Sequence, residues 1–107
     1  MNRCIITGRL ARNAAIRGNG NKALVFTVAS KYGHNEKENK ERVAFVPCVI
    51  FNPSRELEEQ LVNQGPKTYI ELEGRVSSSS YESDGEKRYN TEVVVYNQSV
   101  VVHPHSV

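Results

Sequence analysis

The feature that most constrains the fold of this chain is a series of short segments in which apolar and polar residues alternate. A period of two is typical of β-strands that bury one face. Five segments are predicted to be strands, at residues 3–10, 23–31, 42–51, 68–76 and 88–96, and residues 99–103 either extend the last segment or form a short extra strand. The charged residues 32–41 predict a flexible connection. The side chains expected to point inward include Cys4, Ile6, Gly8, Leu10, Leu24, Phe26, Val28, Ile70 and Leu72.

A single convincing helix follows the third segment. Asn52 can cap its start, Pro53 suits its first turn, and Gly65 can end it. Leu57 and Leu61 lie four residues apart on its buried side. The order of three strands, a helix and two strands predicts an all-β fold. We expect a five-stranded Greek-key barrel of the oligonucleotide-binding (OB) type, with the helix between strands three and four and an extended hairpin between strands four and five.

Length and composition predict one soluble domain. The 107 residues suffice for one core, and we expect it to cover residues 1–102, with a short C-terminal tail at 103–107. The formal net charge is only +2, so any nucleic-acid binding depends on local placement of Arg and Lys. The sequence has no apolar run of membrane-spanning length and no signal-peptide pattern at its start. We therefore expect a cytoplasmic protein with reduced cysteines.

The segment 42–51 is apolar on both faces, although a barrel has only one interior. We expect the even-numbered face, from Ala44 to Ile50, to point into the core. Phe45, Val49 and Phe51 then point outward, with the two rings six residues or about 20 Å apart. Two interpretations stay open. The rings either cover a subunit interface or lie under the helix, or they form a platform that stacks unpaired bases.

Basic residues are expected to share the outward surface with these rings. Each cation alone is typical of an ordinary solvated side chain. Rings and cations together are what a groove that follows a nucleic-acid backbone requires. The candidates are Arg3 and Arg9 on the first strand, Lys31 at the end of the second, and Arg75 and Arg88 at the bases of the two hairpin strands.

The predicted last hairpin is unusually polar. Between Val76 and Asp84 the only large apolar side chain is that of Tyr81, and residues 77–80 are all serine. Such an arm does not need to pack on the barrel. Tyr81 gives it a flat surface for a base, and Lys87 and Arg88 give it charge. The alternative is a mobile loop with no role.

Several motifs, in order, resemble the bacterial single-stranded DNA-binding protein family over nearly the full length. They are "MNRCIITGRLARNAAIR", "FVPCVIF", "ELEGRV" and "YESDGEKRYNTEVVV". The resemblance implies an OB barrel, commonly a homotetramer, that binds single-stranded DNA in replication, recombination or repair, without catalysis, in the bacterial cytoplasm and nucleoid. It also implies that Phe45, Phe51 and Tyr81 stack bases, that Tyr32 can supply another ring, and that Arg3 occupies a basic position of the family.

The chain also departs from the pattern of that family. It has no tryptophan, whereas many members have one at the positions of Phe45 and Tyr81. It ends in "VVHPHSV" without the flexible linker and acidic tip that recruit repair enzymes in relatives, so we expect no recruitment by that route. A replication-restart accessory of the primosomal type, typically a dimer, is an alternative. A pure assembly protein with the rings in its interface is another.

Other chemistry is weakly supported by the sequence. Cys4 and Cys48 form no C-x-x-C pair and are expected to be buried, inert thiols. His103 and His105 alone do not complete a zinc site. The sequence carries no nucleophile motif and no phosphate loop. We therefore expect no enzyme activity, no metal and no cofactor.

Overall fold

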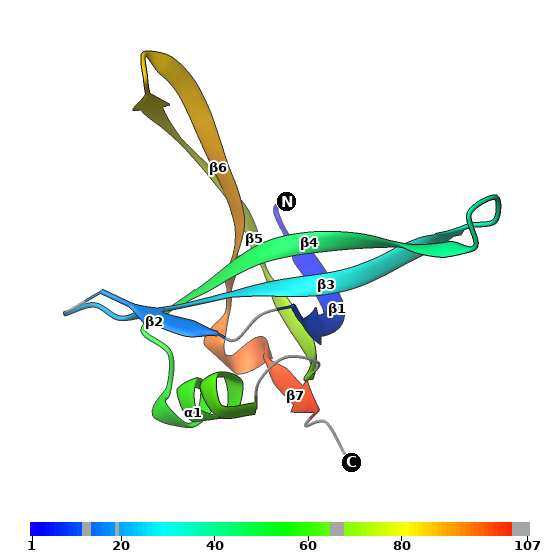
Figure 1. Ribbon diagram of the computed structural model, residues 1–107. Coiled ribbons are helices and arrows are strands. Elements are labelled where there is room, and N and C mark those ends of the chain that lie inside the picture. Colours follow the sequence, from blue (N-terminus) through cyan, green and yellow to red (C-terminus); the bar gives the residue numbers. More distant parts are fainter. Residues whose placement is uncertain (12–13, 19, 65–67, 104–107) are drawn as a thin grey trace.

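Four of the strands are 10 to 15 residues long, and there is one α-helix among the residues that the structure describes (Figure 1). The computed structural model describes residues 1–11, 14–18, 20–64 and 68–103. Within those ranges, no helix is long and apolar enough to cross a membrane. The elements are β1 (Cys4–Leu10), β2 (Ala15–Arg17), β3 (Ala23–Asn35), β4 (Lys40–Phe51), α1 (Arg55–Gln64), β5 (Tyr69–Ser83), β6 (Glu86–Val95), a 3₁₀ turn (Asn97–Ser99) and β7 (Val101–His103).

Five strands close into a barrel, which confirms the predicted fold class. The sheet runs β1-β3-β4-β6-β5, and an additional pairing of β1 with β5 completes the circuit. The β4–β6 pairing is parallel, and the other four pairings are antiparallel. The short strands β2 and β7 add to β3 and β5. β2 was not predicted, because three residues are too few to display a period of two.

The barrel interior has the predicted composition. The inward residues of β1, β3 and β5 are buried or half-buried, and Leu57 and Leu61 cover the core from α1. On β4, the even-numbered face points inward as expected. Val49 is an exception to the expected outward face, since it is only 3% exposed. It is paired on both sides, opposite Val25 of β3 and Val94 of β6, and both of these residues are half-buried.

Closing a five-stranded barrel brings backbones unusually close together at two glycines. A Cβ atom at Gly8 would lie 2.3 Å from the carbonyl oxygen of Ala29, and one at Gly74 would lie 2.3 Å from that of Val94. No side chain fits in that space, so glycine is required where β1 crosses β3 and where β5 crosses β6.

The helix starts later than predicted. The cap is Ser54 and not Asn52, because the backbone N–H of Leu57 donates to Ser54 Oγ at 3.2 Å. Asn52 instead takes a left-handed conformation, with φ of 50°. Its carbonyl oxygen and that of Phe51 accept hydrogen bonds from the side-chain amide of Asn97, at 3.5 and 3.2 Å. The predicted end at Gly65 lies outside the described residues.

The predicted flexible connection at residues 32–41 is mostly strand, so that prediction was wrong. β3 continues to Asn35, β4 begins at Lys40, and the two form an arm that projects from the barrel (Figure 1). Asn35 Oδ1 accepts a hydrogen bond from the backbone N–H of Lys37 at 3.1 Å and so shapes the turn. The ladder shifts register between Lys31 and Gly33, which leaves Tyr32 exposed at a bulge.

The predicted polar hairpin forms a second arm, which leaves the barrel in another direction (Figure 1). It is a continuous ribbon of β5 and β6, paired from Gly74–Val95 out to Ser83–Glu86. Asp84 and Gly85 both have positive φ, of 53° and 79°, which suits a tight two-residue turn. At its base, the side chain of Asn2 pairs with the backbone of Val76 through hydrogen bonds of 2.7 and 2.9 Å.

The beginning of the C-terminal segment extends the sheet as a short strand. β7 pairs with β5 from Val101 to His103, so the short extra strand is the outcome for residues 99–103. Residues 104–107 of the predicted tail, including His105, lie outside the described residues.

Candidate nucleic-acid interface

Two phenylalanine rings stand on the outer face of β4, as the alternation predicts. Phe45 is 67% exposed and Phe51 is 52% exposed. Neither ring belongs to the core, and neither is covered by α1, whose buried contacts are those of Leu57 and Leu61. The interpretation that the rings lie under the helix is therefore wrong. Stacking of bases and burial against a second copy both remain compatible with their exposure.

Strand pairing sets each ring at the end of a transverse row of three residues. Arg9 of β1 lies opposite Ala29 of β3, which lies opposite Phe45. The second row has the same composition, since Arg17 of β2 lies opposite Ala23, which lies opposite Phe51. Directly opposed residues share one face of a sheet. In each row a small alanine therefore separates a guanidinium from an aromatic ring on the outer face.

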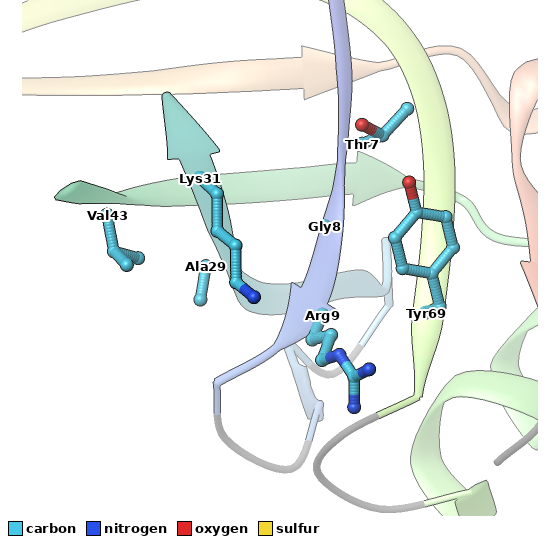
Figure 2. Close-up of a pocket in the computed structure, with 7 residues that line it drawn as sticks. All are labelled: Thr7, Gly8, Arg9, Ala29, Lys31, Val43 and Tyr69. Atoms are coloured by element: carbon cyan, nitrogen blue, oxygen red, sulfur yellow. The ribbon is translucent and has the colours of Figure 1, made fainter. Parts of the chain in front are cut away.

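Three hollows lie along β3 and border these rows. The first, of about 380 Å³, lies beside Arg9, Ala29 and Lys31 (Figure 2). The second, of about 500 Å³, is lined by Ala11, Thr27, Phe45 and Pro47. The third, of about 210 Å³, shares Thr27 and Pro47 with the second and extends to Arg17. We call these three hollows together the β3 channel.

Three of the predicted cations already pair with carboxylates. These surface pairs are weak, because water competes for both partners. The hydrogen bond to Glu73 raises the pKa of Arg3, and the hydrogen bond from Lys31 lowers the pKa of Glu41. Because these surface pairs are weak, a phosphate can replace each carboxylate at little cost in free energy. The pairs are Arg3–Glu73 at 2.9 Å, Lys31–Glu41 at 2.8 Å and Arg88–Glu86 at 3.6 Å.

Other cations have no carboxylate within ion-pair distance in the described part of the chain. Those near the rings are Arg9, Arg17, Arg75 and Lys87, and the others are Lys22, Lys37, Lys40 and Arg42. Arg9 and Arg17 lie at the β3 channel, and Arg75 lies at the base of the β5–β6 arm, as predicted. Arg17 was missed, because its position depends on the short strand β2, which the alternation does not display.

Near its turn, the β5–β6 arm carries one ring and one cation on each of its two faces. Tyr81 lies opposite Arg88, so these two share a face. Lys87 lies on the other face, where its ammonium is 5.7 Å from the ring centre of Tyr89. The prediction that Arg88 lies at the base of the arm was wrong, since it is close to the Asp84 turn. Tyr89 was missed, although its spacing of two residues from Lys87 and from Thr91 places all three on one face of the strand.

The cysteines and histidines form no metal site among the described residues, where no three potential ligands come together. Burial raises the pKa of the Cys48 thiol to about 12, and Cys4 is half-buried beside the core. His103 Nε2 lies 3.2 Å from Glu71 Oε2 on the outer face of the β5–β7 pair.

Comparison with known proteins identifies the family. The sequence model of the single-strand binding protein family matches residues 1–101. A single-stranded DNA-binding protein of Clostridium perfringens is 31% identical over 99 residues, which cover 89% of this chain and 62% of that protein. One of Lactiplantibacillus plantarum is 32% identical over 104 residues, which cover 94% and 51%. This chain thus spans about half to three fifths of the length of these relatives.

A solved structure shares the fold at low sequence identity. The Plasmodium falciparum SSB in complex with ssDNA matches with a TM-score of 0.74, covers 99% of this chain and 96% of its own, and is 13% identical. At that identity the likeness shows a shared fold and nothing further. From the match of its family model over residues 1–101, this chain belongs to the single-strand binding protein family.

Proposed function

We propose that this chain binds single-stranded DNA without sequence preference, in replication, recombination or repair, and that it does so without catalysis or a cofactor. The observation that carries the proposal is the pair of transverse rows, each with an arginine, an alanine and an exposed phenylalanine. A base stacked on the ring and a phosphate held by the guanidinium fit the two ends of such a row. The names of the bacterial relatives and of the structural neighbour point the same way.

Stacking explains why such binding ignores sequence. Every base has a π-face, so a ring accepts any of the four bases, and each stacked base contributes about 1–3 kcal/mol. The groups opposite Phe45 and Phe51 are alanine side chains, which offer no hydrogen bond to a base edge. Cations at the β3 channel then contribute affinity through the phosphates, which are the same in every sequence.

A competition experiment tests the proposal. We expect unlabelled oligo-dT, oligo-dC and mixed-sequence single strands to displace a fluorescent oligo-dT at similar concentrations. A duplex of the same length should compete far less well, because its bases are stacked on each other and cannot reach Phe45 or Phe51. Equal competition by duplex would show that the cations alone bind phosphate, and the stacking part of the proposal would be wrong.

We further propose that the chain assembles into a homo-oligomer, with a tetramer favoured and a dimer possible. Within the described residues, β1 pairs with β3 only at Arg9 and Leu10, so the edge of Cys4–Gly8 that faces away from β5 is unpaired. Ile5 is exposed beside that edge. An unpaired strand edge with an exposed apolar side chain favours pairing with another chain.

The mass in solution tests this assembly. Sedimentation or light scattering should give a mass that is a multiple of 12.0 kDa. Ile5→Asp should lower this mass, because the new carboxylate would lie close to the same carboxylate of a second copy. Ser79→Asp is the control, since it adds the same charge at an exposed position on the β5–β6 arm, away from that edge. A wild-type mass of 12.0 kDa at working concentration would contradict the proposed assembly.

A further inference from the structure

The hollow beside Arg9 and Lys31 has an aromatic wall that the sequence did not suggest. Tyr69 of β5 lines it and lies opposite Arg9 of β1. The hollow measures about 380 Å³, which is within the range of small-ligand sites. Figure 2 shows the Tyr69 ring beside β1, with Thr7 near its hydroxyl end and Arg9 near its base, while Lys31 reaches across from β3. An aromatic face, two cations and a hydroxyl group therefore border one space.

The ring of Tyr69 is held in position from the opposite side. Its centre is 5.8 Å from that of the His103 ring, at an angle of 52° between the planes. His103 is in turn 3.2 Å from Glu71 on the same strand as Tyr69. Tyr69 is still 39% exposed. A ring that is fixed on one side and open on the other loses little conformational entropy when a flat partner stacks on it.

The charges of the hollow suit a phosphate. Arg9 has no carboxylate within ion-pair distance among the residues described, so its guanidinium donors are free on the outer face. An arginine can hold a phosphate with two parallel hydrogen bonds. Lys31 provides a second positive charge, although Glu41 holds it at 2.8 Å.

We infer that this hollow is a nucleotide subsite, in which one base stacks on Tyr69 while the adjoining phosphate binds Arg9. The inference rests on the proposed function and extends it. Tyr69, Arg9, Ala29 and Phe45 form one continuous transverse row over four strands, so the subsite lies at the far end of the first row from Phe45. A strand bound at Phe45 thereby gains a path off the β3 channel, over β1 and onto β5.

Photo-crosslinking tests the location directly. An oligo-dT that carries 5-iododeoxyuridine at one position is irradiated with the wild-type protein, and the modified peptides are identified by mass spectrometry. We expect adducts on Tyr69 as well as on the β4 rings. Adducts on the β4 rings without any on Tyr69 would overturn the inference and leave the proposed function intact. No binding of oligo-dT at all would overturn both.

Affinity measurements on variants supply the second test. Tyr69→Leu keeps an apolar side chain but removes the ring, and it should weaken oligo-dT binding roughly 5- to 150-fold, the equivalent of about 1–3 kcal/mol for one stacked base. Tyr69→Phe should recover most of that loss. Tyr96→Leu is the matched control, because Tyr96 is 41% exposed but lies outside the hollow. An unchanged affinity in a folded Tyr69→Leu protein would overturn the inference.

A double-mutant cycle tests whether Tyr69 and Arg9 hold the same nucleotide. If they do, the loss caused by Tyr69→Leu should be smaller in an Arg9→Gln background than in the wild type. The same cycle with Arg17→Gln should be additive to within about twofold, because Arg17 belongs to the other row. Additivity in both cycles would show that Tyr69 and Arg9 do not share a nucleotide.

Discussion

Replacing Phe45 by alanine separates the two roles that its exposure allows. The side chain is 67% exposed, so only about a third of its surface is buried within one chain. Full burial of a Phe side chain stabilises a fold by about 1.5–3 kcal/mol, so the substitution should lower the free energy of unfolding by only about 0.5–1 kcal/mol. Loss of one stacked base should weaken DNA binding by about 1–3 kcal/mol, or about 5- to 150-fold in Kd.

The assay is an oligo-dT titration by fluorescence anisotropy, with urea unfolding and sedimentation on the same samples. Phe45→Tyr is the control, because it keeps a ring on the same backbone, and it should bind nearly as well as the wild type. If Phe45→Ala binds as tightly as the wild type, the stacking role is wrong for this ring. If affinity is kept while the oligomer dissociates, Phe45 belongs to a subunit interface.

Particular contacts lead to further predictions. Glu41→Gln should tighten oligo-dT binding and steepen its log–log salt dependence by up to about 0.7, because Lys31 is then free to neutralise a phosphate; an affinity lower than wild type would contradict this. Since Lys31 lowers the pKa of Glu41, their ion pair stabilises the fold above the usual pKa of a glutamate and is lost as the pH falls through the lowered value. At low pH, the difference in oligo-dT affinity between Glu41→Gln and the wild type should therefore vanish. The thiol of Cys48, with its pKa raised to about 12 by burial, should not react with a disulfide reagent at pH 8 until urea unfolds the protein. Gly8→Ala should destabilise the fold by about 1–3 kcal/mol in urea titrations, because its methyl group would lie 2.3 Å from the carbonyl oxygen of Ala29, and a stability equal to wild type would show that β1 can move away.

The barrel itself could be predicted from the sequence, because most of its strands have one apolar, buried face and one polar, exposed face. Leu24, Phe26 and Val28 alternate with smaller or polar residues, and they are all buried as expected. The same argument assigned the even-numbered face of β4 to the core. It failed at Val49, whose burial depends on neighbours from β3 and β6 that are distant in sequence.

The β3–β4 arm could not be predicted, because neither of its faces is apolar. From Lys31 to Arg42, side chains on both sides of the ribbon are charged or polar and mostly exposed, so no period of two distinguishes it from a loop. The β5–β6 arm was recognised only because Asp84-Gly85 is a specific hairpin turn signal and because the chain resembles a known family. The start of α1 was misplaced because two residues with capping side chains, Asn52 and Ser54, flank Pro53.

The candidate site was half visible in the sequence. Outward parity identified Phe45, Phe51 and several of the cations. It could not identify which cation faces which ring, since the rows depend on the register between strands that are far apart along the chain. For the same reason the pairing of Arg3 with Glu73, and the approach of Tyr69 to Arg9, appear only in the folded chain.

The most direct test of the central claim is the salt dependence of oligo-dT binding. It is measured on the wild type and on the double variant Arg9→Gln/Arg17→Gln. A channel of rings and cations predicts binding that weakens steeply with salt, with each contacted phosphate contributing about −0.7 to the log–log slope. Removing both arginines should flatten the slope by about 1.4, while the affinity that remains at high salt, supplied by the rings, should persist. An affinity that does not respond to salt, or a slope that is unchanged in the double variant, would contradict the assignment of the β3 channel as the path of single-stranded DNA.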